Sequence, residues 1–301
     1  IINITLILIV LQAKKNHNFM NILEVNSDEY RRWRDRKLSS FTSDIDKLMV
    51  EIKNPRKLST AEISLSSQII KQSNLVFFQL KENENDIKSS LLDLAGQFGM
   101  SDFEILESSE KSGLTKIEVS SESKEKSEYV PYTNKALNWH TDGYYSENDN
   151  PILSWLLYCQ SNSSNGGENS FMDHEIAYIL FNDESSAIDD LMSKDAFTIP
   201  ANVQNGRRAM SSYVFRLLNN KLHMKFSMRE KNIIWSEKII SSVDLLKSII
   251  RENENYQINY KLSPNQGVIS NNVIHMRSSF TNTSNKNRLL YRLRSKKRIS
   301  I

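Results

Sequence analysis

The stretch Trp139-His140-Thr141-Asp142-Gly143 carries the most informative pattern in this sequence. Successive side chains of a β-strand alternate between its two faces, so His140 and Asp142 would point to the same side. One imidazole and one carboxylate can then share a metal ion. Two histidines and one carboxylate on one face of an octahedron form the iron site of non-haem Fe(II) oxygenases. Because an isolated His-x-Asp is common, the interpretation depends on a second histidine elsewhere in the chain.

His275 is the best candidate for that second histidine. It lies in the apolar segment Gly267–Arg277, which we expect to form a strand after a Pro-Asn-Gln turn. Of the other histidines, His17 is close to the N-terminus, His174 lies in an acidic run, and His223 shares a polar strand face with basic residues. We therefore predict a metal site in which His275 joins the His-x-Asp pair.

The segment Arg288–Arg294 places three arginines on one face of another predicted strand, since period two aligns Arg288, Arg292 and Arg294. A guanidinium binds a carboxylate through two parallel hydrogen bonds and stays charged when buried, so Arg288 suits a dicarboxylate ligand. A solvated edge strand that leads into a basic tail is the alternative. We apply this second interpretation to Arg294 and to the tail, residues 294–298.

Hydrophobic periodicity predicts helices early in the chain and strands after Tyr129. The charged segment Ser27–Asn54 opens with a helix-start signature, and Ile87–Phe98 has apolar residues at helical spacing. The other predicted elements are strands at Leu75–Leu80, Leu222–Arg229 and Tyr256–Leu262, helices near Glu184–Ser193 and Val243–Glu252, and an exposed loop or hairpin at 108–128. We expect the two later strands to be half-buried, because apolar and polar residues alternate along them.

The composition is that of an ordinary globular protein, with 39% hydrophobic and 25% charged residues in a chain of 301. Lys and Arg number 39 against 36 Asp and Glu, and a net charge of +3 gives no field that would select nucleic acid or an acidic membrane. Cys159 is the only cysteine, which excludes an intramolecular disulfide and fits a cytoplasmic location. We expect a small-molecule substrate, and a homo-oligomer stays open.

The N-terminal segment is apolar but has the wrong form for an anchor or an export signal. Its apolar run of about eleven residues is shorter than the roughly 18 residues that span a bilayer. Lys14 and Lys15 follow the run, whereas a secretory signal carries its positive charge before it. We interpret residues 1–19 as upstream sequence before a start at Met20. Residues 20–301 are then expected to form one domain, with its core at about 129–294.

These motifs together resemble the taurine dioxygenase-like (TauD/TfdA) family of Fe(II)- and 2-oxoglutarate-dependent oxygenases. His140-Thr141-Asp142 is similar to the family's H-[TS]-D motif, and Gly166-Gly167-Glu168 to its G-G-[DE] turn. The segment His275–Phe280 is similar to H-G-R-T-A-F, with Met276 in place of the usual Gly. The spacing of Arg288 and Arg292 matches the arginine pair that follows in the family.

The resemblance, which runs from roughly Tyr129 to Arg294, implies an α+β fold with a mainly β core. That core would be a double-stranded β-helix, or jelly roll, with flanking helices. It also implies an Fe(II) ion held by His140, Asp142 and His275. Family-like halogenases lack the carboxylate, so the presence of Asp142 favours hydroxylation, in which O2 is consumed and 2-oxoglutarate is converted to succinate and CO2.

The resemblance further assigns the co-substrate site. Arg288 would bind the distal carboxylate of 2-oxoglutarate, and Arg292 would lie deeper, toward the co-substrate or a substrate anion. Asn169 lies near the position where many family members supply a Thr hydroxyl, and its amide can still donate a hydrogen bond.

The substrate is less well defined by the sequence. We expect a small, anionic or amino-acid-like metabolite, with Tyr144 and Tyr145 as candidate contacts and lid segments within 108–138 and 201–212. Two other classes of protein remain open. The same ligands could hold Zn(II) or Mn(II) in a hydrolytic barrel, or the chain could be a non-catalytic binding protein on the same scaffold. Binding of 2-oxoglutarate separates the oxygenase from the hydrolase.

Overall fold

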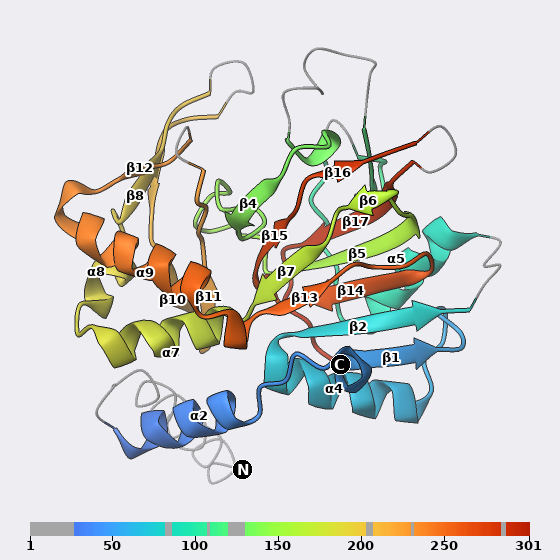
Figure 1. Cartoon of the computed structure of the whole chain (residues 1–301), viewed down its shortest axis with the longest axis horizontal. Helices are drawn as coiled ribbons and strands as arrows, with labels where there is room; N and C mark the ends of the chain where they lie inside the picture. Colours follow the sequence, from blue (N-terminus) through green and yellow to red (C-terminus); the bar gives the residue numbers. More distant parts are fainter. Residues whose placement is uncertain are drawn as a thin grey trace, which may run out of the picture.

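The computed structural model describes residues 27–81, 86–106, 109–119, 130–202, 207–229, 232–283 and 287–301. The interpretation of residues 1–19 as upstream sequence lies outside these residues. None of the helices within the described ranges combines the length and apolarity that a membrane crossing requires. The fold mixes helices and sheets (Figure 1).

The largest sheet in the described part of the chain has six strands in the order β1-β2-β14-β5-β17-β3. β1 and β2 are parallel, and the other neighbours are antiparallel. The strands are β1 (Met49–Ile52), β2 (Leu75–Leu80), β14 (Gln266–Ser270), β5 (Ser154–Ser161), β17 (Leu289–Ser295) and β3 (Thr115–Glu118). β1, β2 and β3 precede residue 129, so this sheet includes strands from before the segment 129–294.

A second, antiparallel sheet has four strands in the order β13-β7-β15-β4. They are β13 (Ile258–Tyr260), β7 (Asn169–Met172), β15 (Ile274–Arg277) and β4 (Leu137–His140). Phe171 of β7 packs against Phe77 of β2 and Trp155 of β5, with ring centroids 5.6 Å and 6.2 Å away. All three rings are buried. The two sheets therefore meet across an aromatic core, and this contact places β15 close to β5.

The described helices lie outside these sheets (Figure 1). They are α2 (Asp28–Ser39), α3 (Ile45–Leu48), α4 (Thr60–Ser73), α5 (Ile87–Gln97), α7 (His174–Glu184), α8 (Ile188–Met192) and α9 (Ile240–Glu252), with short 3-10 turns η1 (Val130–Tyr132), η4 (Glu237–Ile239) and η5 (Glu254–Tyr256). α4 packs against β1 and β2, while α7 packs against α9. Val243, Leu246 and Ile250 of α9 are fully buried, as the predicted apolar face of this helix requires.

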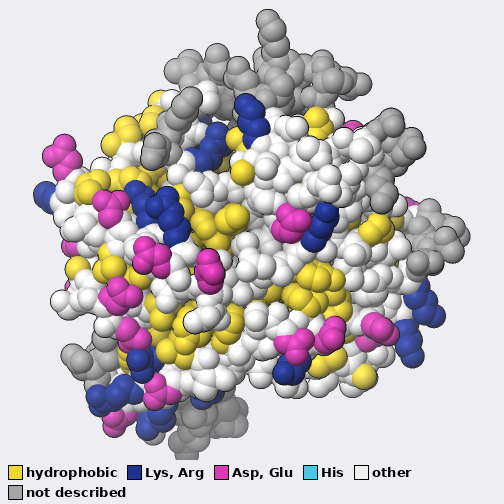
Figure 2. Space-filling model, viewed as in Figure 1, with side chains coloured by type: hydrophobic (Ala, Val, Ile, Leu, Met, Phe, Trp, Pro, Cys, Tyr) yellow, Lys and Arg dark blue, Asp and Glu magenta, His cyan; other side chains and the backbone are white. Residues whose placement is uncertain are grey.

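Three small sheets complete the described fold. They pair β10 (Phe215–Leu218) with β11 (Lys221–Met224), β16 (Phe280–Thr281) with β6 (Asn165–Gly166), and β12 (Ile234–Trp235) with β8 (Phe197–Ile199), which also pairs with β9 (Met210–Ser212). On the face shown in Figure 2, acidic, basic and apolar side chains are interspersed. That mixture agrees with the nearly balanced charge of the sequence.

Two predictions about local structure were wrong. The predicted helix Ser27–Asn54 is α2 and α3 followed by β1, since Val50 and Ile52 bury their side chains where β1 pairs with β2. The predicted exposed loop or hairpin at 108–128 contains β3, which pairs with β17 and buries Thr115 and Ile117, while residue 108 and residues 120–128 lie outside the described part. Local composition does not reveal either strand because each depends on pairing with a distant partner.

The predicted half-buried strand Leu222–Arg229 also differs from the structure, in its length and in its burial. Its regular part ends at Met224, and the side chains of its polar face are buried rather than solvated. His223 is 3% exposed and Lys225 is 1% exposed. The ammonium of Lys225 donates to the Ser146 carbonyl and to the side chain of Asn148, so the loop after the His-x-Asp stretch covers it.

Candidate metal centre and co-substrate pocket

The three predicted metal ligands come together. His140 on β4 and His275 on β15 are direct cross-strand partners, and their ring centroids lie 4.3 Å apart. Asp142 follows β4, with Oδ1 3.7 Å from Nε2 of His140 and 4.0 Å from Nε2 of His275. The possible ligand atoms all lie within 4.8 Å of one another, and no other group in the described ranges has this composition and spacing.

Both imidazoles are oriented by backbone carbonyls. Nδ1 of His140 lies 2.8 Å from the Asn138 carbonyl, and Nδ1 of His275 lies 3.0 Å from the Val273 carbonyl. A carbonyl only accepts hydrogen bonds, so each Nδ1 donates, which leaves Nε2 as the ring nitrogen available to a metal ion. Burial, and then the neighbouring His140, lower the pKa of His275 to about 3. His275 is therefore a neutral imidazole whose free nitrogen faces Asp142, which is the form that binds a metal.

Asp142 is the anionic member of the group and is 5% exposed. Burial alone would raise its pKa, but Arg292 and His140 outweigh burial and hold the pKa well below its usual value. Nη1 of Arg292 lies 3.4 Å from Oδ2, and Oδ2 is buried without a hydrogen bond. An ionised carboxylate with an unsatisfied oxygen beside two free imidazole nitrogens fits a divalent metal ion.

A pocket adjoins the three ligands and contains three arginines, Arg277, Arg288 and Arg292. Arg288 is 4% exposed, and its guanidinium carbon lies 5.1 Å from the centroid of the Phe280 ring. Among the residues that the structure describes, no acid or hydrogen-bond acceptor contacts this guanidinium. Burial lowers the pKa of Arg288 to about 10, so the group stays charged at neutral pH. The pocket therefore has an uncompensated buried cation.

The Gly-Gly turn lets Arg288 reach this position. Gly167 has a φ of +81°, and a Cβ added there would lie 3.3 Å from Nε of Arg288 and 2.9 Å from Oγ of Ser163. A residue with a side chain would be strained at that φ and crowded at that distance. The turn thus contributes to the pocket, because the bare backbone of Gly167 leaves room for Arg288.

The remaining predicted site residues differ in their positions. Asn169 on β7 lines the pocket and is 5% exposed. Tyr144 and Tyr145 do not line it, within the part of the chain described: Tyr144 is buried in the core, and the hydroxyl of Tyr145 accepts a hydrogen bond from Arg294. Asn169 therefore lies where a pocket residue was expected, whereas neither Tyr144 nor Tyr145 is among the described residues that line the pocket.

The interpretation of Arg294 as a solvated strand end was wrong, whereas Lys297 in the tail is exposed as we expected. Arg294 is 5% exposed, forms an ion pair with Glu104 and donates to Tyr145. Arg298 donates to the Leu222 carbonyl and to the side chain of Asn74. The reason is that β17 lies inside the sheet, between β5 and β3, and the backbone of Glu104 bonds to Arg294.

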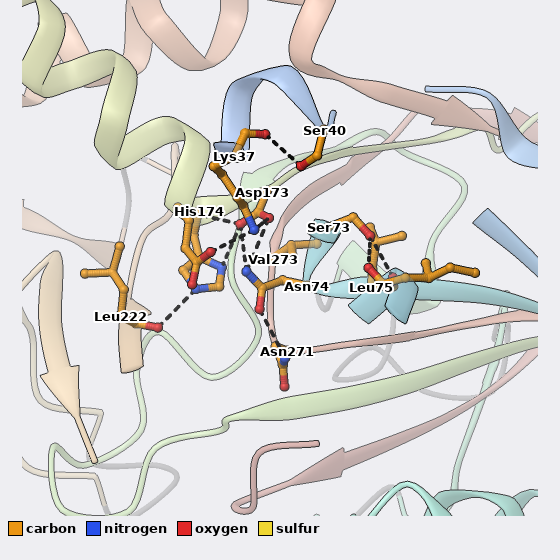
Figure 3. Close-up of polar contacts among 12 residues, drawn as sticks. Lys37, Ser40, Ser73, Asn74, Leu75, Asp173, His174, Leu222, Asn271 and Val273 are labelled. Atoms are coloured by element: carbon orange, nitrogen blue, oxygen red, sulfur yellow. Dashed lines mark hydrogen bonds and ion pairs between the residues drawn. The ribbon is translucent and has the colours of Figure 1, made fainter. Parts of the chain in front are cut away.

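Of the histidines that we set aside, His174 lies in a buried polar cluster (Figure 3), and the buried His223 is close enough to it that His174 lowers the pKa of His223. His174 is at the start of α7, and its Nε2 lies 3.1 Å from the Leu222 carbonyl. Beside it, Nζ of Lys37 lies 2.6 Å from a carboxylate oxygen of Asp173 and 2.7 Å from one of Glu175. This cluster joins α2 to α7 and is structural.

Sequence reasoning missed several residues that line the pocket, and Arg277 and Trp155 are two of them. Arg277 lines the pocket and donates to the carbonyls of Thr133 and Lys135, and its position two residues after His275 was an available signal. Trp155 of β5 also lines it, with its ring centroid 4.9 Å from that of His275. No local pattern in the sequence places Trp155 there, because the contact depends on how the two sheets pack.

Comparison with known families identifies the chain. Residues 40–294 match the model of the taurine catabolism dioxygenase TauD, TfdA family, which is more than half of the chain. The protein therefore belongs to this family of Fe(II)- and 2-oxoglutarate-dependent oxygenases, as its motifs predicted. No curated protein sequence matches the chain.

Several solved structures have a similar fold at low sequence identity. An asparagine oxygenase superposes with a TM-score of 0.57 and 10% identity, covering 83% of this chain and 93% of its own. A taurine dioxygenase from Burkholderia xenovorans has a TM-score of 0.53 and 13% identity, covering 82% and 87%. The PvcB protein from Pseudomonas aeruginosa has a TM-score of 0.54 and 14% identity, covering 82% and 84%. At these identities the likeness shows the fold alone.

Proposed function

We propose that this protein is an Fe(II)- and 2-oxoglutarate-dependent dioxygenase that hydroxylates an unactivated C–H bond of a small metabolite. The observation that carries this proposal is the combination of two sites in one pocket. Three ligand atoms lie within 4.8 Å of one another, and the buried Arg288 nearby lacks a counter-ion among the described residues.

His140, Asp142 and His275 would hold Fe(II) through two imidazole nitrogens and one carboxylate oxygen, leaving the other coordination positions open. When bound, iron and 2-oxoglutarate supply the oxidising chemistry, in which O2 is consumed and 2-oxoglutarate becomes succinate and CO2. The protein's task is placement. The carbonyls of Asn138 and Val273 fix the imidazoles, and Arg292 keeps Asp142 ionised.

Arg288 would bind the distal carboxylate of 2-oxoglutarate through its planar fork, which would supply the anion that this guanidinium does not find among the described residues. Asn169 can add a hydrogen bond from its amide, since it lines the same pocket. Arg292 lines the same pocket as Asp142, with Nη1 3.4 Å from Oδ2, and its charge can also face the carboxylate nearer the metal. A hydrolytic zinc enzyme has no need for a buried cation that receives a dicarboxylate.

For the fold, we propose that the six-stranded and four-stranded sheets form a distorted double-stranded β-helix within a single domain. The support is that almost all their strands pair antiparallel and that Phe171 packs between the two sheets. The metal ligands would then lie at the end of the four-stranded sheet where β4 and β15 meet.

The substrate class that we propose is a small, anionic or amino-acid-like metabolite. Among the structures with a similar fold is an asparagine oxygenase in complex with Fe(II), 3-hydroxyasparagine and succinate, with a TM-score of 0.54 and 10% identity. Tyr144 and Tyr145 follow the metal carboxylate directly in sequence and remain candidate substrate contacts.

The test is succinate formation by the purified protein with Fe(II), 2-oxoglutarate and O2, followed by an untargeted comparison of the metabolites that are consumed. We expect succinate release that requires all three additions, that is lost in His275→Ala, and that increases with the metabolite consumed. Binding of 2-oxoglutarate without any turnover would instead favour a non-catalytic binding protein. Hydrolysis with Zn(II) and without 2-oxoglutarate would favour the other metal enzyme.

A further inference from the structure

Asn272 is a buried asparagine at the turn that leads into β15. It is 2% exposed, and its backbone has a φ of +59°, a left-handed conformation that Asn tolerates better than most residues. Both the oxygen and the nitrogen of its side-chain amide form hydrogen bonds. Oδ1 accepts from the backbone N–H of Asp142 at 2.8 Å, while Nδ2 donates to the Asp142 carbonyl at 2.9 Å and to the Ile152 carbonyl at 2.8 Å.

These bonds fix both ends of the loop 142–152, which begins with the metal carboxylate and returns to the sheet. The two ends are also in contact with each other. Gly143 turns the chain with a φ of +66°, and a Cβ there would lie only 2.5 Å from Cγ1 of Ile152. The side chain of Asn272 therefore holds a closed loop at the point where it closes.

Asn272 is also tied to the third ligand, because it precedes His275 by three residues in the same segment. The carbonyl of Val273, between them, accepts from Nδ1 of His275, and the Val273 N–H donates to Oγ of Ser270 at 3.0 Å. The turn before β15 is thus fixed at both of its ends. A displacement of Asn272 would change the position of Asp142 relative to His275.

We propose that Asn272 is a positioning residue for the metal centre, which presents Asp142 to the ion that it shares with His140 and His275. This inference rests on the proposed function, since it assumes that these three residues bind Fe(II). Groups that orient metal ligands typically contribute 10- to 100-fold to metal affinity. We therefore expect loss of the Asn272 side chain to raise the Kd for Fe(II) by roughly 10- to 100-fold.

The test compares Asn272→Gly with Asn271→Ala. Glycine accepts the left-handed backbone, so Asn272→Gly removes the side chain without adding strain. Asn271 is 5% exposed and bonds to Asn74 and to the backbone of Ile299, away from the metal centre (Figure 3). Asn271→Ala therefore removes a similar amide one residue away and serves as the matched control.

Both variants should melt at a lower temperature than the unmodified protein in the metal-free state. Only Asn272→Gly should bind Fe(II) more weakly in an anaerobic competition titration with a chelator. Only this variant should shift the charge-transfer absorbance at saturating Fe(II) and 2-oxoglutarate. If Asn272→Gly does not fold, we expect Asn272→Asp, which keeps the acceptor toward Asp142, to bind Fe(II) roughly tenfold more weakly.

Three results would overturn the proposal in distinguishable ways. An unmodified protein that does not bind Fe(II) would remove the proposed function, and the role of Asn272 with it. Normal Fe(II) binding by both the unmodified protein and the Asn272 variant would remove the role alone. Equal weakening in Asn272→Gly and Asn271→Ala would also remove it, because general destabilisation would then explain the loss.

Discussion

Arg288 is buried while charged, and such a group is costly unless an anion pairs with it. The guanidinium of the neighbouring Arg277 donates hydrogen bonds to backbone carbonyls. The guanidinium of Arg288 instead contacts the Phe280 ring and meets no hydrogen-bond acceptor among the described residues. Burial, and then the neighbouring charge of Arg288, lower the pKa of Arg277 to about 9, so the two cations lie close enough to repel each other. A bound dicarboxylate would relieve this arrangement.

Arg288→Lys should therefore weaken binding of 2-oxoglutarate without loss of Fe(II). Lysine keeps the charge but loses the two-pronged donor, and a lost hydrogen bond to a charged group costs on the order of 1.5–3 kcal/mol. This corresponds to a roughly ten- to hundredfold higher Kd, measured by equilibrium titration under anaerobic conditions. Arg294→Lys is the control: it should lower the melting temperature through its contacts with Glu104 and Tyr145 and leave the Kd nearly unchanged. An unaltered Kd in Arg288→Lys would contradict the assignment.

The metal ligands could be predicted one by one, because the alternation of side chains along a strand depends only on neighbouring residues. His140 and Asp142 share a side of β4 and its extension, and His275 was the apolar-strand histidine that the sequence favoured. Asn272 was not predictable, since an amide that bonds to the backbone of a residue 130 positions earlier depends on the fold. Arg294 was misread for the same reason, because its burial comes from the strands on both sides of β17.

At the scale of the elements, β14 lies between β2 and β5 and is closely packed. Gly267 makes this possible: an added Cβ would lie 2.2 Å from Cζ of Phe78 and 2.6 Å from the Leu157 carbonyl. The backbone of β5 cannot move away without breaking its pairing with β17. β14 also leads into the turn before β15, so its position fixes that of His275.

Gly267→Ala should reduce the free energy of unfolding by about 1–3 kcal/mol, the usual cost of overpacking a core. Gly96→Ala in α5 is the matched control, since nothing lies within 4 Å of its added Cβ and alanine favours a helix. That variant should be more stable by up to about 1 kcal/mol. Urea denaturation measures both. Equal stability of the two variants would show that the close packing around β14 is not required.

Elements with a strong local signal were predicted well. The strand Leu75–Leu80 and the helix near Ile87–Phe98 agree with β2 and α5. α7 was missed although Asp173 caps its first turn and Glu175 follows, a recognisable helix start. β1 could not be predicted in the same way, because Met49–Ile52 becomes a strand only through its parallel pairing with β2.

For the protein as a whole, the buried polar groups make stability depend on pH. Burial lowers the pKa of His174, and burial together with His174 and Lys225 holds the pKa of His223 well below its usual value. Nδ1 of His174 and Nε2 of His223 are buried without a hydrogen bond in the described structure. Both imidazoles are therefore neutral in the folded protein at pH values where the unfolded chain, near its ordinary pKa of about 6.5, takes up protons.

The unfolded chain thus binds more protons below about pH 6.5, so the contribution of each histidine is complete above that pH and is lost as the pH falls. We expect the free energy of unfolding to decrease by up to about 1.4 kcal/mol per pH unit for each histidine between roughly pH 6.5 and 5. Urea denaturation at several pH values measures the slope. His223→Gln should make it shallower. The same slope in both proteins would mean that His223 is not a buried neutral group.

The overall arrangement brings residues from distant parts of the chain to one pocket. β4 and β15 carry the histidines, β17 carries Arg292, and Arg288 directly precedes it. Family membership, the ligand geometry and the buried arginine all indicate the same chemistry. The central claim is that Fe(II) and 2-oxoglutarate bind together at this place.

The most direct test is an anaerobic titration of the Fe(II)-loaded protein with 2-oxoglutarate, followed by the metal-to-ligand charge-transfer absorbance. The absorbance should saturate at one equivalent in the unmodified protein and in His174→Ala, because His174 lies outside the centre. His140→Ala, Asp142→Ala and His275→Ala should each lose it, since removing one of three ligands removes both affinity and geometry. Full absorbance in His275→Ala, or none in the unmodified protein, would contradict the assigned metal centre.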